Sequence, residues 1–245
     1  MRSIDLNCDV GEGIGLEAEI LPLVSSANIA CGAHAGDSGT MKSVRAIARA
    51  HGVAVGAHPG FADRENFGRR EMELSEADLR VLLLNQLEEL AEFGRFDYVK
   101  PHGALYNMAA NDADMARVVA STVKEFDADL WLMGLAGSAG LKIAAETGLK
   151  TVAEAFADRR YDDQGGLLSR ALPNAVIGSA DEAIEQVLNL VQRGQVKSAQ
   201  GLMVPMAAES ICLHGDTPGA LRLARRLREA LTAAEIAVQP FVPRT

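Results

Sequence analysis

Residues 3–9 read Ser-Ile-Asp-Leu-Asn-Cys-Asp, and this stretch decides the fold. In an extended strand, side chains two positions apart point to the same face. One face therefore carries Asp5, Asn7 and Asp9, while the other face is apolar. We expect the apolar face to pack against helices and the polar face to line the inside of a closed barrel. Buried polar groups need partners, so we expect them to share one polar cluster.

Short β-type runs of this kind alternate with helical patterns along the chain. The predicted strands are Ser3–Asp9, Ser26–Cys31, Val53–His58, Tyr98–His102, Leu130–Gly134, Thr151–Phe156 and Ser210–His214. The clearest predicted helices are Ser75–Phe93, Asp112–Phe126, Ala180–Gln192 and Pro218–Ala234. Seven such units favour an α/β fold with one irregular seven-stranded (β/α) barrel over an open sheet, so residues 1–245 form a single domain. Gln200-Gly201 between apolar runs predicts a small β-hairpin within residues 196–213.

Composition and charge narrow the partners to small molecules. The 245 residues are 48% hydrophobic and carry a net charge of −9, from 24 basic and 33 acidic residues. That charge disfavours nucleic acid and anionic membrane surfaces. The sequence shows neither a signal-peptide pattern nor about 18 uninterrupted apolar residues, so we expect a cytoplasmic protein. The three widely spaced cysteines, Cys8, Cys31 and Cys212, indicate reduced thiols and no disulfide framework.

Four of the five histidines stand at the ends of predicted strands. They are His34, His58, His102 and His214. In a barrel these strand ends ring one mouth, where active sites lie, and imidazoles there indicate proton transfer, metal binding or anion binding. His51 serves as a control, because it lies in the last turn of a predicted helix, where the helix dipole alone favours a cation.

Other ionisable residues share these strand ends and complete the expected catalytic set. That set is Asp9, His34, His58, Lys100, His102 and Glu154. We expect Lys100 to form a salt bridge with Glu154 or Asp9. Asp9, His34 and His58 also offer one carboxylate and two imidazoles, a ligand set suited to a divalent metal ion. The sequence leaves open whether a metal is bound and which residue is the general base.

Anion binding is expected from glycine-rich and arginine-rich segments near the mouth. Gly134–Gly140 follows a strand and opens a helix, so its N–H groups could hold a phosphate, or the turn could serve close packing alone. Two long loops, Gly60–Glu73 and Asp158–Pro173, each carry an arginine pair. The residues expected to bind substrate or phosphate are Asn7, Glu12, Asp37, Arg69, Arg70, Gly137, Ser138, Asp158, Arg159 and His214.

Several of these segments together resemble the LamB/YcsF family over nearly the whole chain. The segments are Asp5–Glu12, Ala27–Asp37, Gly56–Pro59, Phe67–Arg70, Val99–Asn107, Glu154–Arg159 and Ile211–Asp216. One local departure is Gly60-Phe61-Ala62-Asp63, where the family has a serine-aromatic-proline-aspartate run. The resemblance implies a seven-stranded barrel of the glycoside hydrolase/deacetylase type.

The resemblance also implies an activity. It is the ATP-dependent opening of the 5-oxo-L-proline lactam to L-glutamate, carried out together with two further subunits, B and C. ATP would enter as a cosubstrate with Mg²⁺, and the subunit that binds it is left open. Two alternatives remain: a metal-dependent deacetylase or amidohydrolase that needs no ATP, and a non-catalytic substrate-binding subunit. The sequence also leaves a homo-oligomer open.

Overall fold

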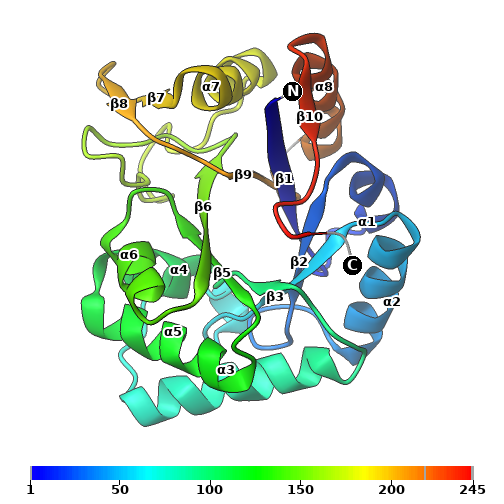
Figure 1. Cartoon of the computed structure of the whole chain (residues 1–245), viewed down its shortest axis with the longest axis vertical. Coiled ribbons are helices and arrows are strands. Elements are labelled where there is room, and N and C mark those ends of the chain that lie inside the picture. Colours follow the sequence, from blue (N-terminus) through cyan, green and yellow to red (C-terminus); the bar gives the residue numbers. More distant parts are fainter. Residues whose placement is uncertain (1, 218, 244–245) are drawn as a thin grey trace.

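Seven parallel strands form a closed barrel in the computed structural model, which describes residues 2–217 and 219–243 (Figure 1). In barrel order they are β1 (Arg2–Val10), β2 (Ser26–Ala30), β3 (Ala54–His58), β4 (Tyr98–Val99), β5 (Trp131–Leu135), β6 (Lys150–Phe156) and β9 (Ser210–His214). Strand β9 pairs with both β6 and β1, and this pairing closes the barrel. The predicted fold class and the seven predicted strands are therefore confirmed.

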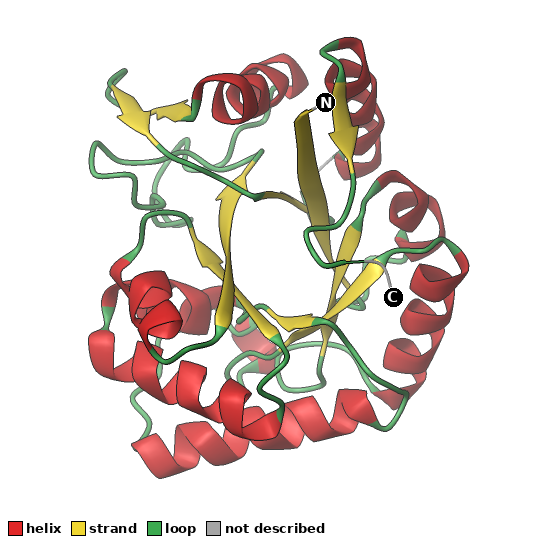
Figure 2. Ribbon diagram, in the orientation of Figure 1, coloured by secondary structure: helices red, strands yellow, loops and turns green. Residues whose placement is uncertain are grey.

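Helices surround the barrel on its outer face (Figure 2). They are α1 (Glu17–Ile20), α2 (Ser38–Ala50), α3 (Glu76–Ala91), α4 (Gly103–Asn111), α5 (Ala113–Phe126), α6 (Ala139–Glu146), α7 (Ala180–Arg193) and α8 (Ala220–Ala233), with 3-10 turns at Leu21–Leu23 and Arg64–Asn66. The four clearest predicted helices correspond to α3, α5, α7 and α8, although the predicted start at Pro218 lies outside the described residues. None of the helices described is both long and apolar enough to cross a membrane.

Three short strands lie outside the barrel. Strands β7 (Gln195–Lys197) and β8 (Met203–Pro205) form the hairpin, which covers the first part of the predicted range and precedes the barrel strand β9. Strand β10 (Ile236–Val238) pairs with the first residues of β1. The sequence did not predict β10, since three residues carry too little periodicity to distinguish a strand from a loop.

The barrel interior changes from apolar to polar along its axis. Near the N-terminal ends of the strands, Tyr98 packs with Met133, and Phe241 of the C-terminal segment contacts the Tyr98 ring at 5.1 Å between centroids. Gly56 makes room for Tyr98, because a Cβ at position 56 would lie 2.2 Å from that ring. The Tyr98 hydroxyl donates to Asn28 Oδ1 at 2.6 Å, where the polar part of the interior begins.

Strand β1 shows the expected alternation. Its apolar side chains pack against the helices with no exposed surface at Leu6 and Cys8, while Asp5, Asn7 and Asp9 face the interior. Burial raises the pKa of Asp5 to about 6, although it accepts hydrogen bonds from three serine hydroxyls. The polar inner face is therefore bonded internally, as buried polar groups require.

Gly140 allows α6 to approach α4 closely. A Cβ at this position would lie 1.8 Å from the carbonyl oxygen of Ala109, in α4, which leaves no room for any side chain. The glycine-rich segment Gly134–Gly140, which ends in the first turn of α6, therefore contributes to close packing. Close packing was one of its two expected roles, and phosphate binding was the other.

We predict that Gly140→Ala destabilises the protein, whereas alanine in a helix ordinarily stabilises relative to glycine by about 0.5–1 kcal/mol. The clash with α4 should reverse the sign and cost about 1–3 kcal/mol. The matched control is Gly178→Ala, since nothing lies within 4 Å of the position that its methyl group would take. Urea unfolding measures both variants, and a Gly140→Ala protein at least as stable as the parent would contradict the packing account.

Candidate active site

A pocket of about 460 Å³ opens at the C-terminal ends of the barrel strands. This volume lies in the range of small-molecule sites. The ionisable and aromatic residues that line it are Asp9, Glu12, His58, Arg69, Glu71, Lys100, His102, Tyr106, Phe156, Arg159, Arg170 and His214. Both long loops contribute to its wall, as the sequence predicts for segments that follow barrel strands.

Lys100 lies in the floor of this pocket and is 2% exposed. Its ammonium group lies 3.0 Å from Asp9 Oδ1, 2.8 Å from Glu154 Oε1 and 3.1 Å from Cys212 Sγ. Burial alone would lower the pKa of Lys100, but Asp9 and the other acidic neighbours raise it well above its usual value. Lys100 is thus a permanent buried cation, and it pairs with both of the carboxylates that the sequence offered as alternatives.

Two asparagines connect these charges beneath the pocket. Asn7 donates to Glu154 Oε1 at 2.9 Å, and Asn28 donates to Asp9 Oδ1 at 2.7 Å and to Asn7 Oδ1 at 2.7 Å. Burial would raise the pKa of Asp9, but His58 and Lys100 outweigh it and hold that pKa well below the usual value. Asn7 does not line the pocket, so its predicted role in substrate binding is replaced by one of positioning.

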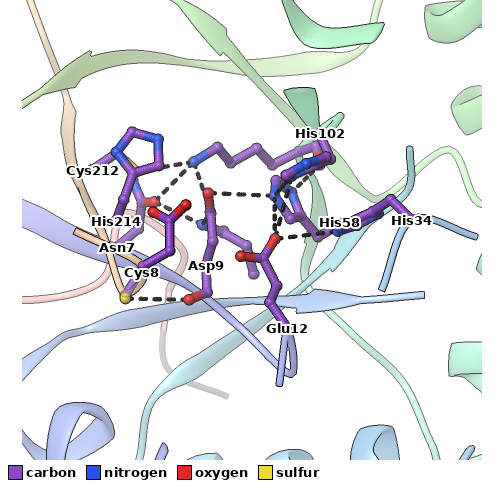
Figure 3. Close-up of polar contacts among 12 residues, drawn as sticks. Asn7, Cys8, Asp9, Glu12, His34, His58, His102, Cys212 and His214 are labelled. Carbon is purple, nitrogen blue, oxygen red and sulfur yellow. Dashed lines mark hydrogen bonds and ion pairs between the residues drawn. The ribbon is translucent and has the colours of Figure 1, made fainter. Parts of the chain in front are cut away.

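Three imidazoles gather on the opposite side of Asp9 from His214 (Figure 3). The rings of His34 and His102 stack with centroids 3.8 Å apart, and His102 Nδ1 lies 2.9 Å from His58 Nε2. Burial and neighbouring imidazoles lower the pKa of His102 well below its usual value and that of His34 to about 2. Both rings therefore stay neutral at physiological pH.

The loop after β3 holds these imidazoles in place. Phe67 accepts a hydrogen bond from His102 Nε2 at 2.9 Å, and its ring meets those of His34 and His102 edge to face. Gly68, at φ +64°, lies so close that a Cβ would stand 2.8 Å from His34 Cβ. On the other side of the loop, buried Gln86 of α3 both donates to and accepts from the backbone of Gly60. This part of the loop is a fixed support for the site.

Glu12 supplies the carboxylate nearest the three imidazoles. It follows Gly11, whose φ of +75° turns the chain sharply after β1. Glu12 Oε1 lies 3.2 Å from His34 Nε2 and 3.3 Å from His102 Nδ1. Burial raises the pKa of Glu12 well above its usual value, and the charge of Asp9 adds to this effect.

The predicted metal set of Asp9, His34 and His58 needs correction. Asp9 Oδ1 is already bonded to Lys100 and Asn28, so this carboxylate belongs mainly to the lysine network. The potential ligand atoms that converge are instead those of Glu12, His34, His58 and His102, all within 4.8 Å of one another. Strand parity could not reveal Glu12, because it lies in a turn beyond the strand.

The opposite wall of the pocket is built around His214. Its Nδ1 lies 2.8 Å from Asp158 Oδ1, and Thr217 donates to the same carboxylate at 2.7 Å. Burial would raise the pKa of Asp158, but His214 and these hydrogen bonds lower it to about 2. The Phe156 ring stacks on His214 with centroids 5.4 Å apart. Asp158 therefore orients His214 from beneath and does not reach the pocket.

Three guanidinium groups line the outer part of the pocket. Arg69 pairs with Asp216, and Arg170 lies 3.9 Å from the same carboxylate. Arg159 is buried and donates to a loop carbonyl, while its Nε has no hydrogen-bond partner among the described residues. Burial, reinforced by Arg170, lowers the pKa of Arg159 to about 10, so it remains a cation at neutral pH.

Besides Asn7 and Asp158, four predicted binding residues lie outside the pocket lining. Asp37 is exposed and caps α2 by accepting from Thr40 N, and the Arg70 side chain is 66% exposed. Ser138 caps α6, next to Gly137. These groups satisfy their own helices or face away from the pocket, so the structure does not support a role for them in substrate or phosphate binding.

Several residues of the site were missed in the sequence. Arg170 and Tyr106 line the pocket, and Phe67 and Gln86 support the imidazoles. Each lies in a loop or on a helix, where no strand alternation marks the direction of a side chain. Tyr106 and Phe67 carried a signal, because each lies in one of the family-like segments.

Comparisons with known proteins agree over the whole chain. The LamB/YcsF family profile matches residues 4–245. The A subunit of 5-oxoprolinase from Haemophilus influenzae (strain PittEE) is 50% identical over 243 residues, 97% of this chain and 99% of that protein. The corresponding protein of Geobacillus thermodenitrificans (strain NG80-2) is 46% identical over 98% of this chain and 97% of its own length.

Two solved structures resemble this chain, one in both sequence and fold and the other in fold alone. The lactam utilization protein of Thermus thermophilus superposes with a TM-score of 0.90 at 42% identity, covering 98% of this chain and 100% of that chain. A T48 deacetylase shares the fold at 12% identity, with a TM-score of 0.51 over 100% of this chain and 95% of that chain. From the profile and these relatives together, the chain belongs to the LamB/YcsF family.

Proposed function

We propose that this chain is the A subunit of a 5-oxoprolinase and carries the site at which the lactam of 5-oxo-L-proline is opened to L-glutamate. The observation that carries the proposal is the buried Asp9–Lys100–Glu154 network in the floor of a pocket bordered by arginines. Relatives 46–50% identical over nearly the whole chain are named as the A subunit of 5-oxoprolinase, which supports the substrate.

The outer part of the pocket suits the substrate's carboxylate. Arginine binds carboxylates through paired N–H groups. Arg159 keeps one N–H without a partner among the described residues, and Arg170 stands beside it in the lining. A carboxylate held there leaves the lactam ring facing the floor, next to Lys100 and Asp9.

The floor suits amide opening. In the proposed reaction the γ-phosphoryl group of ATP passes to the lactam oxygen and ADP leaves. Water then adds to the ring carbon, and the ring C–N bond breaks as the nitrogen takes up a proton. A second water hydrolyses the resulting acyl phosphate to glutamate and phosphate. Lys100 stabilises negative charge that develops on oxygen, because its ammonium is fixed before the reaction. The proposed general base is Oδ2 of Asp9. The other oxygen, Oδ1, already accepts hydrogen bonds from Lys100 and Asn28, whereas Oδ2 lies 3.4 Å from His58 Nε2.

The nucleotide is proposed to arrive with the partner subunits. Gly134–Gly140 lacks the Gly-Lys-Ser/Thr ending that binds phosphates and Mg²⁺ in a P-loop, and this turn lies beside α6 outside the pocket. We therefore infer that subunits B and C complete the site for ATP with Mg²⁺.

We predict that the purified chain is folded but forms little glutamate from 5-oxoproline until ATP, Mg²⁺ and subunits B and C are all present. Glutamate formation is assayed with each component omitted in turn. Full turnover by the chain and ATP alone would contradict the partner requirement. Turnover without ATP would instead identify a metal-dependent amidohydrolase. That alternative is favoured by the four potential metal ligands Glu12, His34, His58 and His102, which we call the Glu12–histidine cluster.

We also predict that His102→Ala lowers turnover of the complete enzyme by about 100-fold or more, the usual effect of losing a positioned group in a site. The matched control is His51→Ala, because His51 is exposed at the end of α2 and should leave turnover nearly unchanged. Both variants must show the parent's circular dichroism. Equal turnover in the two variants would show that His102 and the imidazoles around it do not take part in the proposed reaction.

A further inference from the structure

Four potential metal ligands from four different segments converge beside the pocket. Glu12 comes from the turn after β1, His34 from the loop after β2, His58 from the end of β3, and His102 from the loop after β4. In Figure 3, Glu12 points towards the three imidazoles, on the other side of Asp9 from Cys212 and His214. The site proposed below is defined by these four residues alone.

The hydrogen bonds of two imidazoles determine which of their nitrogens carry protons. His58 Nδ1 lies 2.7 Å from the carbonyl oxygen of Lys100, and His102 Nε2 lies 2.9 Å from that of Phe67. A carbonyl oxygen only accepts, so each of these nitrogens is the donor. If both rings carry a single proton, the remaining nitrogens, His58 Nε2 and His102 Nδ1, are bare lone pairs that face each other at 2.9 Å.

The carboxylate adds further acceptor atoms to the same small volume. Glu12 Oε1 lies 3.2 Å from His34 Nε2, 3.3 Å from His102 Nδ1 and 3.9 Å from His58 Nε2. Among the described residues, the ion pairs of Glu12 involve only these three imidazoles, with no lysine or arginine. Lone pairs gathered in this way require a cation, which can be an extra proton or a metal ion.

A neighbouring cluster provides an internal comparison. Asp9, Cys212 and His214 also stand within metal-binding distance of one another. There, however, the Lys100 ammonium already lies 3.0 Å from Asp9 Oδ1 and 3.1 Å from Cys212 Sγ. That cluster contains a lysine ammonium, whereas the ion pairs of Glu12 with its three imidazoles, as far as the described residues extend, include no lysine or arginine.

The spacing of the four ligand atoms is close to that around a tetrahedral ion, and the stacked rings of His34 and His102 must turn out of parallel for both to bind it. With metal–ligand bonds of about 2.1 Å, donor atoms stand about 3.4 Å apart. The four separations given above range from 2.9 to 3.9 Å, and all of the ligand atoms lie within 4.8 Å of one another. The backbone carbonyls that fix His58 and His102 are the partners that metal-bound imidazoles usually have, and Gly60 and Gly68 press against His34. Three imidazoles and one carboxylate favour zinc-class ions over Mg²⁺.

We propose that Glu12, His34, His58 and His102 bind one divalent transition-metal ion of the zinc class. The site does not depend on the proposed 5-oxoproline activity, because metal binding is measured directly on the isolated chain. Failure of either proposal leaves the other testable.

The test is metal titration of the chelator-treated full chain, with calorimetry for Zn²⁺ and visible absorption for Co²⁺. We expect one equivalent of each metal to bind, a tetrahedral Co²⁺ spectrum, and no comparable binding of Mg²⁺. His58→Ala and Glu12→Gln should each weaken Zn²⁺ binding by at least about 10-fold, since each removes or neutralises a ligand. His51→Ala should bind like the parent.

Two results would overturn the proposal. Substoichiometric binding by the folded parent protein would mean that the cluster holds a proton instead of a metal. Parent-like affinity in both His58→Ala and Glu12→Gln would place the metal elsewhere on the chain. Glu12→Gln nearly preserves the size of the side chain, so the comparison stands even if a histidine variant fails to fold, and the parent's stoichiometry is decisive by itself.

Discussion

The buried ammonium of Lys100 is the interaction on which the inside of this barrel depends. Two buried carboxylates, Asp9 and Glu154, face it from strands on either side of β9, and uncompensated charges at such depth would be too costly to keep. Asn7 and Asn28 distribute the remaining hydrogen bonds between them. The network gives the pocket a floor of fixed charges, so little reorganisation is needed when charge develops on a substrate.

The mouth is rigid because helices fasten the loops that follow the strands. Gln86 of α3 bonds to the backbone of Gly60, and Gln186 of α7 donates to the carbonyls of Phe156 and Arg159. Each amide acts where a strand pairing has ended and backbone groups would otherwise lack partners. The first loop supports the histidines and contributes Arg69 to the pocket, while the second contributes Arg159 and Arg170.

Strand alternation made the barrel and much of its floor predictable from the sequence. Asp9, Lys100 and Glu154 stand in strands or directly after them, where a period of two fixes the direction of each side chain. The role of Glu12 and the contribution of Arg170 were not predictable, since turns and long loops have no such period. The structure does not support the anion-binding interpretation of Ser138, which caps α6. A strand–glycine–helix segment looks the same in sequence whether its N–H groups bind a ligand or its glycines only permit close packing.

The most direct test of this account is a double-mutant cycle between Lys100 and Glu154, measured by urea unfolding of Lys100→Met, Glu154→Gln and the combined variant. Each single change should destabilise the protein by about 3–5 kcal/mol, because it leaves a buried charge with fewer partners. The combined variant should recover at least about 1 kcal/mol relative to the sum of the single effects. Strictly additive effects would show that the two charges do not depend on each other, and would contradict the central role given to the buried ammonium.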